Sequence, residues 1–294
     1  MAGTTIGEAA ALSAAGTGLL QIEDCEIDEH CVGHRWQVRN LDELARCIAI
    51  IAMGQALQAA HLISLLEQMQ PAFTTEELKA EAIRTLTVQE DKQEPRVGYP
   101  QVQRDGFIFE AISWIAAKQT YGGTAYLKDP HVSSTSQGLD GLMLELTADK
   151  SDITRVTVFE DKCTKKPKET FAYKVMPGFQ DRHKNRRSAE IISTASVLLK
   201  TAGLADGDAI KLASAVLKLQ KRRYRAALTV TAEFDNSEAR SDLFSKFKEL
   251  DGISKDQRHG ACFVVPSELR SWFNDLAEVA IAYLNDLDPE MLNV

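Results

Sequence analysis

From residue 105 onward, short apolar segments with the pattern of β-strands alternate with longer segments that have helical periodicity. Strand patterns cover residues 124–128, 140–147, 154–163, 225–233 and 261–265. Helical patterns cover residues 105–119, 178–202, 208–222, 237–250 and 267–287. Strands mixed with helices are typical of a sheet that is covered by helices. We therefore expect a mixed α/β (α+β) fold with a central sheet in this part of the chain.

The first 95 residues have a different pattern. Apolar residues recur at helical spacing from Leu41 to Gln70, and a second helix is expected from Thr75 to Val88. Polar residues at 89–98 indicate a linker. We therefore expect two domains, which are a helical region at 1–95 and an α/β domain at 96–294.

Two segments near the N-terminus carry no helical pattern. Residues 1–18 consist mostly of Ala, Gly, Ser and Thr, and few apolar side chains could anchor them to a core. We expect this start of the chain to be poorly ordered. Residues 20–31 carry five acids, and we expect them to form a solvated acidic loop.

The net charge of −8 argues against a general nucleic-acid binder, because such proteins tend to be basic. The distribution of charge reverses that inference. Residues 162–187 hold nine Lys and Arg side chains against two acids, residues 211–225 hold six against none, and residues 1–95 hold six against fifteen. Basic clusters suit a phosphate backbone, and a solvated basic helix face is the alternative. The candidate contacts are Lys165, Lys166, Lys168, Arg182, Lys184, Arg186 and Arg187.

The strand pattern at 154–163 ends in charged residues on a mostly apolar face. Because side chains alternate along a strand, Glu160 and Lys162 share one face with two valines. Unlike charges on such a face are costly unless they are paired or liganded. Asp140 opens the preceding strand, so a hairpin would bring it near Glu160. Two acids and a lysine suit a divalent cation such as Mg²⁺, and the alternative is a salt bridge at a strand end.

The order of these elements over residues 105–235 resembles the core of the PD-(D/E)xK nuclease superfamily: a helix, a strand, a strand with Asp, a strand with Glu-x-Lys, a helix and a strand. The resemblance implies a restriction-endonuclease-like fold, with a central mixed sheet flanked by helices. It also implies that Asp140 and Glu160 bind Mg²⁺ (or Mn²⁺). Lys162 would assist the hydrolysis of a phosphodiester bond.

The resemblance extends to the preceding helix and departs from the family at one position. Glu110 matches an additional acid that contacts the metal directly or through water in many members. The residue before Asp140 is Leu139, where the family pattern has proline. The motifs are short, so they do not identify a substrate.

The resemblance implies a magnesium-dependent endonuclease that acts on DNA. Nucleases of this superfamily often serve restriction, repair or bacterial anti-phage defence, so we expect a defence effector. By analogy with such systems, a helicase or other ATPase would be its partner, bound through the acidic region at 1–95. Two alternatives stay open. One is a non-catalytic nucleic-acid-binding subunit of a defence or repair complex, whose acids only pair with Lys162. The other is an adaptor in which the helical region does the work.

Other features indicate a cytoplasmic protein without a membrane partner. No run of about eighteen apolar residues occurs, and the N-terminus lacks the basic start of a secretory signal. The five cysteines are an odd number and suit a reducing cytosol. Cys25, His30, Cys31 and His34 lack the paired spacing that is typical of zinc sites. His131 either approaches the predicted metal site or lies on the surface.

Overall fold

A computed structural model describes residues 18–132 and 138–288 of the chain. Its strands are β1 (Leu20–Cys25), β2 (Val32–Val38), β3 (Ala125–Leu127), β4 (Gly141–Leu146), β5 (Ile153–Lys162), β6 (Arg222–Val230) and β7 (Arg258–Val264). In this part of the chain they form one sheet in the order β1-β2-β7-β6-β5-β4-β3. The central strands β2, β7, β6 and β5 run parallel, while β1, β4 and β3 toward the two edges pair antiparallel.

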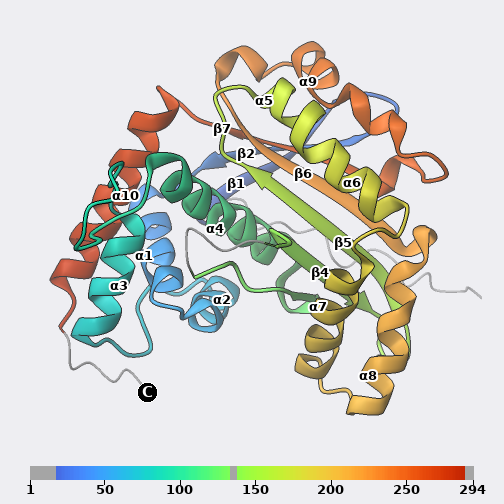
Figure 1. Ribbon diagram of the computed structural model, residues 1–294, viewed down its shortest axis with the longest axis horizontal. Helices are drawn as coiled ribbons and strands as arrows, with labels where there is room; N and C mark the ends of the chain where they lie inside the picture. The colour runs from blue at the N-terminus through green and yellow to red at the C-terminus, as the bar shows by residue number, and fades with distance from the viewer. Residues whose placement is uncertain (1–17, 133–137, 289–294) are drawn as a thin grey trace, which may run out of the picture.

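Helices cover both faces of this sheet (Figure 1). One layer consists of α1 (Leu41–Ala52), α2 (Ala56–Leu65), α3 (Glu76–Leu86), α4 (Gln101–Tyr121) and α10 (Leu269–Asp286). The other layer consists of α5 (Pro167–Thr170), α6 (Met176–His183), α7 (Ser188–Thr201), α8 (Asp206–Ala213) and α9 (Ser237–Phe244). Each layer packs its own cluster of buried apolar side chains against the sheet. Across the described ranges, no helix combines the length and the apolar character needed to cross a lipid bilayer.

The prediction of a central sheet covered by helices is confirmed. Helix α4 contains the helix predicted at 105–119, and strands β3 to β7 begin and end within three residues of the predicted strands. Strands β4 and β5 form the expected antiparallel hairpin. The mixed α/β class therefore follows from the periodicity of the sequence.

The single helix predicted at 178–202 is wrong. Helix α6 ends at His183 and helix α7 begins at Ser188. Between them, Asn185 and Arg187 have φ angles of 56° and 57°. These angles lie in the left-handed region, where a right-handed helix cannot continue. The basic residues between the two helices therefore lie on a turn.

The predicted acidic loop at 20–31 is wrong for its first half, which is strand β1, whereas residues 26–31 connect β1 to β2. Leu20 and Ile22 pack into the core on the α4 side of the sheet, and Gln21 between them faces the other way. This alternation is the pattern of a half-buried strand. Gln119 of α4 accepts a hydrogen bond from the Leu20 amide and donates one to its carbonyl, which satisfies the open edge of β1 at this residue.

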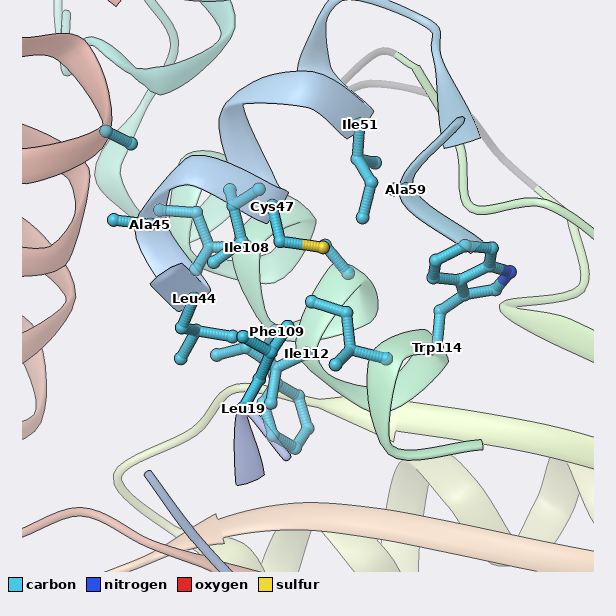
Figure 2. Packing of buried hydrophobic residues seen from close by; sticks show 14 of the residues in the cluster. Leu19, Leu44, Ala45, Cys47, Ile51, Ala59, Ile108, Phe109, Ile112 and Trp114 are labelled. Atoms are coloured by element: carbon cyan, nitrogen blue, oxygen red, sulfur yellow. The ribbon is translucent and has the colours of Figure 1, made fainter. Parts of the chain in front are cut away.

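The predicted helical region at 1–95 contains α1, α2 and α3, and it also contributes two strands to the sheet. Thr75 caps α3 by accepting a hydrogen bond from the Leu78 amide. Figure 2 shows side chains of α1 and α2, including Cys47 and Ile51, packed against those of α4, including Ile112. Residues on both sides of the predicted linker therefore share one sheet and one core. The expected poor order of the N-terminus concerns residues that lie almost entirely outside the described ranges.

Replacing Leu20 by alanine tests whether β1 belongs to the folded core. Leu20 is 2% exposed, so we expect Leu20→Ala to lower the free energy of unfolding by about 2 kcal/mol or more, because a buried leucine leaves a cavity. Leu57 is 73% exposed, and Leu57→Ala should change it by less than about 0.5 kcal/mol. Urea unfolding of both variants measures this. Equal stabilities would contradict the placement of Leu20 in the core.

Candidate functional site

The hairpin of β4 and β5 brings two acids to the same end of the sheet. Gly141 pairs with Phe159, so Asp140, which precedes β4, lies beside the last residues of β5. The amide of Asp161 donates a hydrogen bond to Asp140 Oδ2 at 2.8 Å. The main chain of β5 therefore fixes one carboxylate oxygen of Asp140 close to Glu160.

Lys162 joins these two acids. Its Nζ lies 2.5 Å from Asp140 Oδ2 and 3.0 Å from Glu160 Oε2. We call Asp140, Glu160 and Lys162 the carboxylate–lysine site. Burial would lower the pKa of Lys162, but the charges and hydrogen bonds of the two acids outweigh it and raise this pKa above its ordinary value. Lys162 is therefore a cation at neutral pH.

Arg182 of α6 holds the other side of Glu160. Its Nη1 lies 2.5 Å from Glu160 Oε1, and its side chain is 1% exposed. The structure therefore corrects the predicted role of Arg182, because a buried guanidinium cannot contact a nucleic-acid backbone. Glu190 of α7 lies behind it, 3.8 Å from Arg182 Nη2. Sequence reasoning missed Glu190, whose only signal is its place in the first turn of α7.

Glu110 contacts His131 and none of the three residues of the carboxylate–lysine site, as far as the described residues show. Its Oε1 accepts a hydrogen bond from the His131 amide at 2.9 Å, and its Oε2 lies 3.0 Å from His131 Nδ1. Among the described residues, both oxygens of Glu110 thus contact His131. The alternative that His131 lies on the surface is wrong, since its side chain is only 17% exposed.

Asp161 points to the opposite face of the sheet from Glu160 and Lys162. Its Oδ1 lies 3.3 Å from Arg225 Nη2, and Arg225 also donates a hydrogen bond to Ser113 of α4. Burial raises the pKa of Asp161 to about 7, although Arg225 opposes the rise and Asp140 adds to it. The sequence pattern placed Asp161 on this face, but nothing in the pattern indicated that Arg225 would be buried beside it.

Most of the predicted phosphate-contacting residues are exposed and paired with acids. The pairs are Lys165 with Glu268 (2.5 Å), Lys166 with Glu169 (3.5 Å), Lys168 with Asp242 (2.6 Å), Arg186 with Asp181 (3.3 Å) and Arg187 with Glu190 (3.5 Å). Lys184 is exposed as well. The Lys or Arg side chain is more than half exposed in each of these pairs, so solvent weakens the pairing and a phosphate could replace the acid.

The second basic segment, at 211–225, is not a continuous basic surface. Arg222 is 0% exposed and donates hydrogen bonds to the carbonyls of Val216 and Arg182. Arg225 is 5% exposed and lies over the ring of Phe159 at 3.6 Å. The predicted phosphate-binding surface therefore fails for these two arginines, which are structural.

The donor atoms of the carboxylate–lysine site fit a hard divalent cation. Asp140 and Glu160 each place one oxygen within 3.0 Å of a single nitrogen, so the two carboxylates converge. Mg²⁺ is commonly held by one or two carboxylates, with water and substrate phosphate as the other ligands. Among the described residues, no group of three or more His, Cys, Asp or Glu side chains is arranged to hold a metal ion. Cys25, His30, Cys31 and His34 do not form such a group either.

Comparisons with known proteins leave the site as the guide to function. No family model matches the chain, and no curated protein is significantly similar to it. What the protein does therefore has to be inferred from the carboxylate–lysine site and from the charged side chains around it.

The raised pKa of Asp161 predicts a pH dependence of stability. The unfolded chain releases this proton near the ordinary pKa of 3.8, whereas the folded chain keeps it up to about pH 7. The folded state thus binds more protons in this window, and its free energy of unfolding falls as pH rises through it. Asp161→Asn removes this contribution. In urea unfolding, the free energy of unfolding of the wild type minus that of Asp161→Asn should therefore decrease from about pH 4 to about pH 7. A constant difference would contradict the assignment.

Proposed function

We propose that this protein is a metal-dependent nuclease that hydrolyses phosphodiester bonds of DNA, with a restriction-endonuclease-like core. The observation that carries the proposal is the β4–β5 hairpin, which joins Asp140 and Glu160 through Lys162 at one end of the sheet. Two converging carboxylates with a half-buried cation suit phosphoryl chemistry, in which negative charge develops on oxygen. The resemblance of the surrounding elements to PD-(D/E)xK nucleases supports the same reading.

Asp140 and Glu160 would hold the metal ion, Mg²⁺ or Mn²⁺, in this proposal. When bound, the metal would polarise a phosphoryl oxygen and lower the pKa of a water molecule. Glu110 would serve as the additional acid only when His131, which contacts both of its oxygens, gives way.

Lys162 would act as a charged hydrogen-bond donor. In the reaction, the oxygen of water bonds to phosphorus and the bond from phosphorus to the leaving sugar oxygen breaks. The water gives one proton to solvent and the leaving oxygen takes one up. Because Asp140 and Glu160 keep Lys162 protonated, its Nζ would orient the water or stabilise the phosphoryl oxygens, and it would not serve as a general base.

The exposed basic side chains after β5 would hold the nucleic-acid backbone. They are Lys165, Lys166, Lys168, Lys184, Arg186 and Arg187, and they follow in the sequence after the strand that carries Glu160 and Lys162.

We also propose that the protein is a defence effector that acts with a helicase or other ATPase. The acidic excess at 1–95 would repel DNA, so it favours contact with a protein partner there.

A second candidate is a non-catalytic nucleic-acid-binding subunit. It is favoured by the complete pairing of Glu160, whose Oε1 contacts Arg182 and whose Oε2 contacts Lys162. Paired in this way, the charges need no metal to be stable in a half-buried place. Such a protein would bind DNA with a strong dependence on salt but would not cut it.

Cleavage of plasmid DNA separates the two candidates. With Mg²⁺ or Mn²⁺ we expect the wild type to cut DNA, and Glu160→Gln or Lys162→Met to reduce the rate by about 100-fold or more, since each removes a charge from the reacting centre. Lys221→Met is the matched control. Its ammonium is also half-buried and paired, at 2.5 Å from Asp152, but it lies near the other end of β5, and this variant should cut like the wild type.

The outcomes of this assay are distinct. A wild type that binds DNA and cuts neither DNA nor RNA with either metal would favour the second candidate. Cleavage that survives both site substitutions would show that the carboxylate–lysine site is not the active site. Faster cleavage of RNA than of DNA would change the substrate but keep the chemistry.

A further inference from the structure

A line of alternating charges leads from Glu160 to the surface, and it deepens the proposed function on which it rests. Glu160 contacts Arg182 at 2.5 Å, Arg182 lies 3.8 Å from Glu190, and Glu190 lies 3.5 Å from Arg187. We call these four residues the relay. Arg187 is 55% exposed, whereas Arg182 is 1% exposed. One end of the relay thus faces solvent and the other end contacts the proposed metal ligand.

Glu190 is an under-bonded member of the relay, as is Arg182, whose buried Nε has no hydrogen-bond partner among the described residues. Its Oε2 is the oxygen that approaches both arginines, and it is buried with no hydrogen-bond partner among the described residues. Nearly all buried polar atoms in proteins have such a partner, so this oxygen is an exception that asks for an explanation. It lies at similar distances from two guanidinium groups and is fully satisfied by neither. A small movement toward either arginine would form a short ion pair with it.

The main chain around the relay leaves the space that its buried side chains occupy, because glycine stands at two neighbouring positions. An added Cβ at Gly178 would lie 3.2 Å from Arg182 Nη1, and one at Gly138 would lie 3.1 Å from Glu190 Oε1. The main chain of the α6–α7 turn is fixed as well, because Arg222 donates hydrogen bonds to the Arg182 carbonyl and to Asn185 Oδ1. The exposed side chain of Arg187 is therefore the member of the relay that a ligand can displace.

We propose that Arg187 contacts a backbone phosphate of the bound nucleic acid and that Glu190 is a positioning residue that transmits this contact to Glu160. A phosphate on Arg187 draws its guanidinium away from Glu190. Glu190 then pairs with Arg182, and Arg182 loosens its hold on Glu160 Oε1. That oxygen becomes available to the metal when the substrate is present.

The relay links two binding events in both directions. If a phosphate on Arg187 raises the affinity of Glu160 for a divalent cation, the cation must raise the affinity for the phosphate by the same factor. Nucleic acid and metal would therefore bind together more tightly than either binds alone. The free protein would therefore bind the metal more weakly than the protein with bound nucleic acid.

The test measures Mn²⁺ binding by the free, full-length protein with isothermal titration calorimetry. Arg187→Gln releases Glu190 permanently, so it should imitate bound phosphate and raise the Mn²⁺ affinity by about five-fold or more, the lower end of typical coupling. Arg186→Gln is the matched control. Arg186 is a neighbouring exposed arginine that contacts Asp181, and its loss should leave the Mn²⁺ affinity unchanged.

A double variant separates the relay from simple electrostatics. Loss of a positive charge could raise Mn²⁺ affinity at a distance, and that effect would be the same with or without Glu190. In the relay, Glu190→Gln should abolish the gain caused by Arg187→Gln, so the two changes would not be additive. Additive effects, or equal effects of Arg187→Gln and Arg186→Gln, would overturn the inference.

The same variants distinguish failure of the relay from failure of the proposed nuclease. DNA cleavage by the wild type together with unchanged Mn²⁺ binding in Arg187→Gln would leave the nuclease standing and overturn the relay. Non-additive Mn²⁺ binding without any cleavage would support the relay and refute the nuclease. A chain that binds no Mn²⁺ at millimolar concentration would overturn both.

Discussion

The charge balance at the end of β5 is the constraint on which the arrangement of the site depends. Asp140, Glu160 and Arg182 come from a strand start, a strand end and a helix, and each would be costly to bury alone. Lys162 and Arg182 place their cationic groups within 3.0 Å of the two carboxylates and so neutralise their charge. The β4–β5 hairpin and α6 must therefore pack in one fixed relative position. Removing any one partner would leave an unpaired charge in a half-buried site of low polarity, which is costly.

The alternation of side chains along β5 divides three consecutive residues between two environments. Glu160 and Lys162 face the layer that contains α6 and α7, whereas Asp161 faces α4 and pairs with Arg225. Asp140 lies close to both environments, since it binds the side chain of Lys162 and the main-chain amide of Asp161. A change of charge on one face of the sheet is therefore felt on the other, as the effect of Asp140 on the pKa of Asp161 shows.

The sequence predicted what depends on local periodicity and missed what depends on distant partners. The β4–β5 hairpin and the approach of Asp140 to Glu160 followed from strand patterns close together in the chain. The burial of Arg182 and Arg225 could not be foreseen, because runs of basic residues usually lie on the surface. Strand β1 was missed for a different reason: its acids obscured the alternation of Leu20 and Ile22 with polar residues, and its neighbour β2 finds its second partner, β7, more than 200 residues away.

The pairing of β2 with β7 has a consequence for the way the chain folds. Val32 lies opposite His259, so β2 cannot pair with β7 until the more than 200 residues between them have been synthesised. Contacts between such distant residues slow folding, because the intervening chain must be ordered before they are made. During synthesis the edge of β2 that later pairs with β7 is therefore unpaired, and such an edge is prone to pair with other chains. Of the strands in the described ranges, β7 comes latest in the sequence, and it covers the edge that the β1–β2 hairpin leaves open.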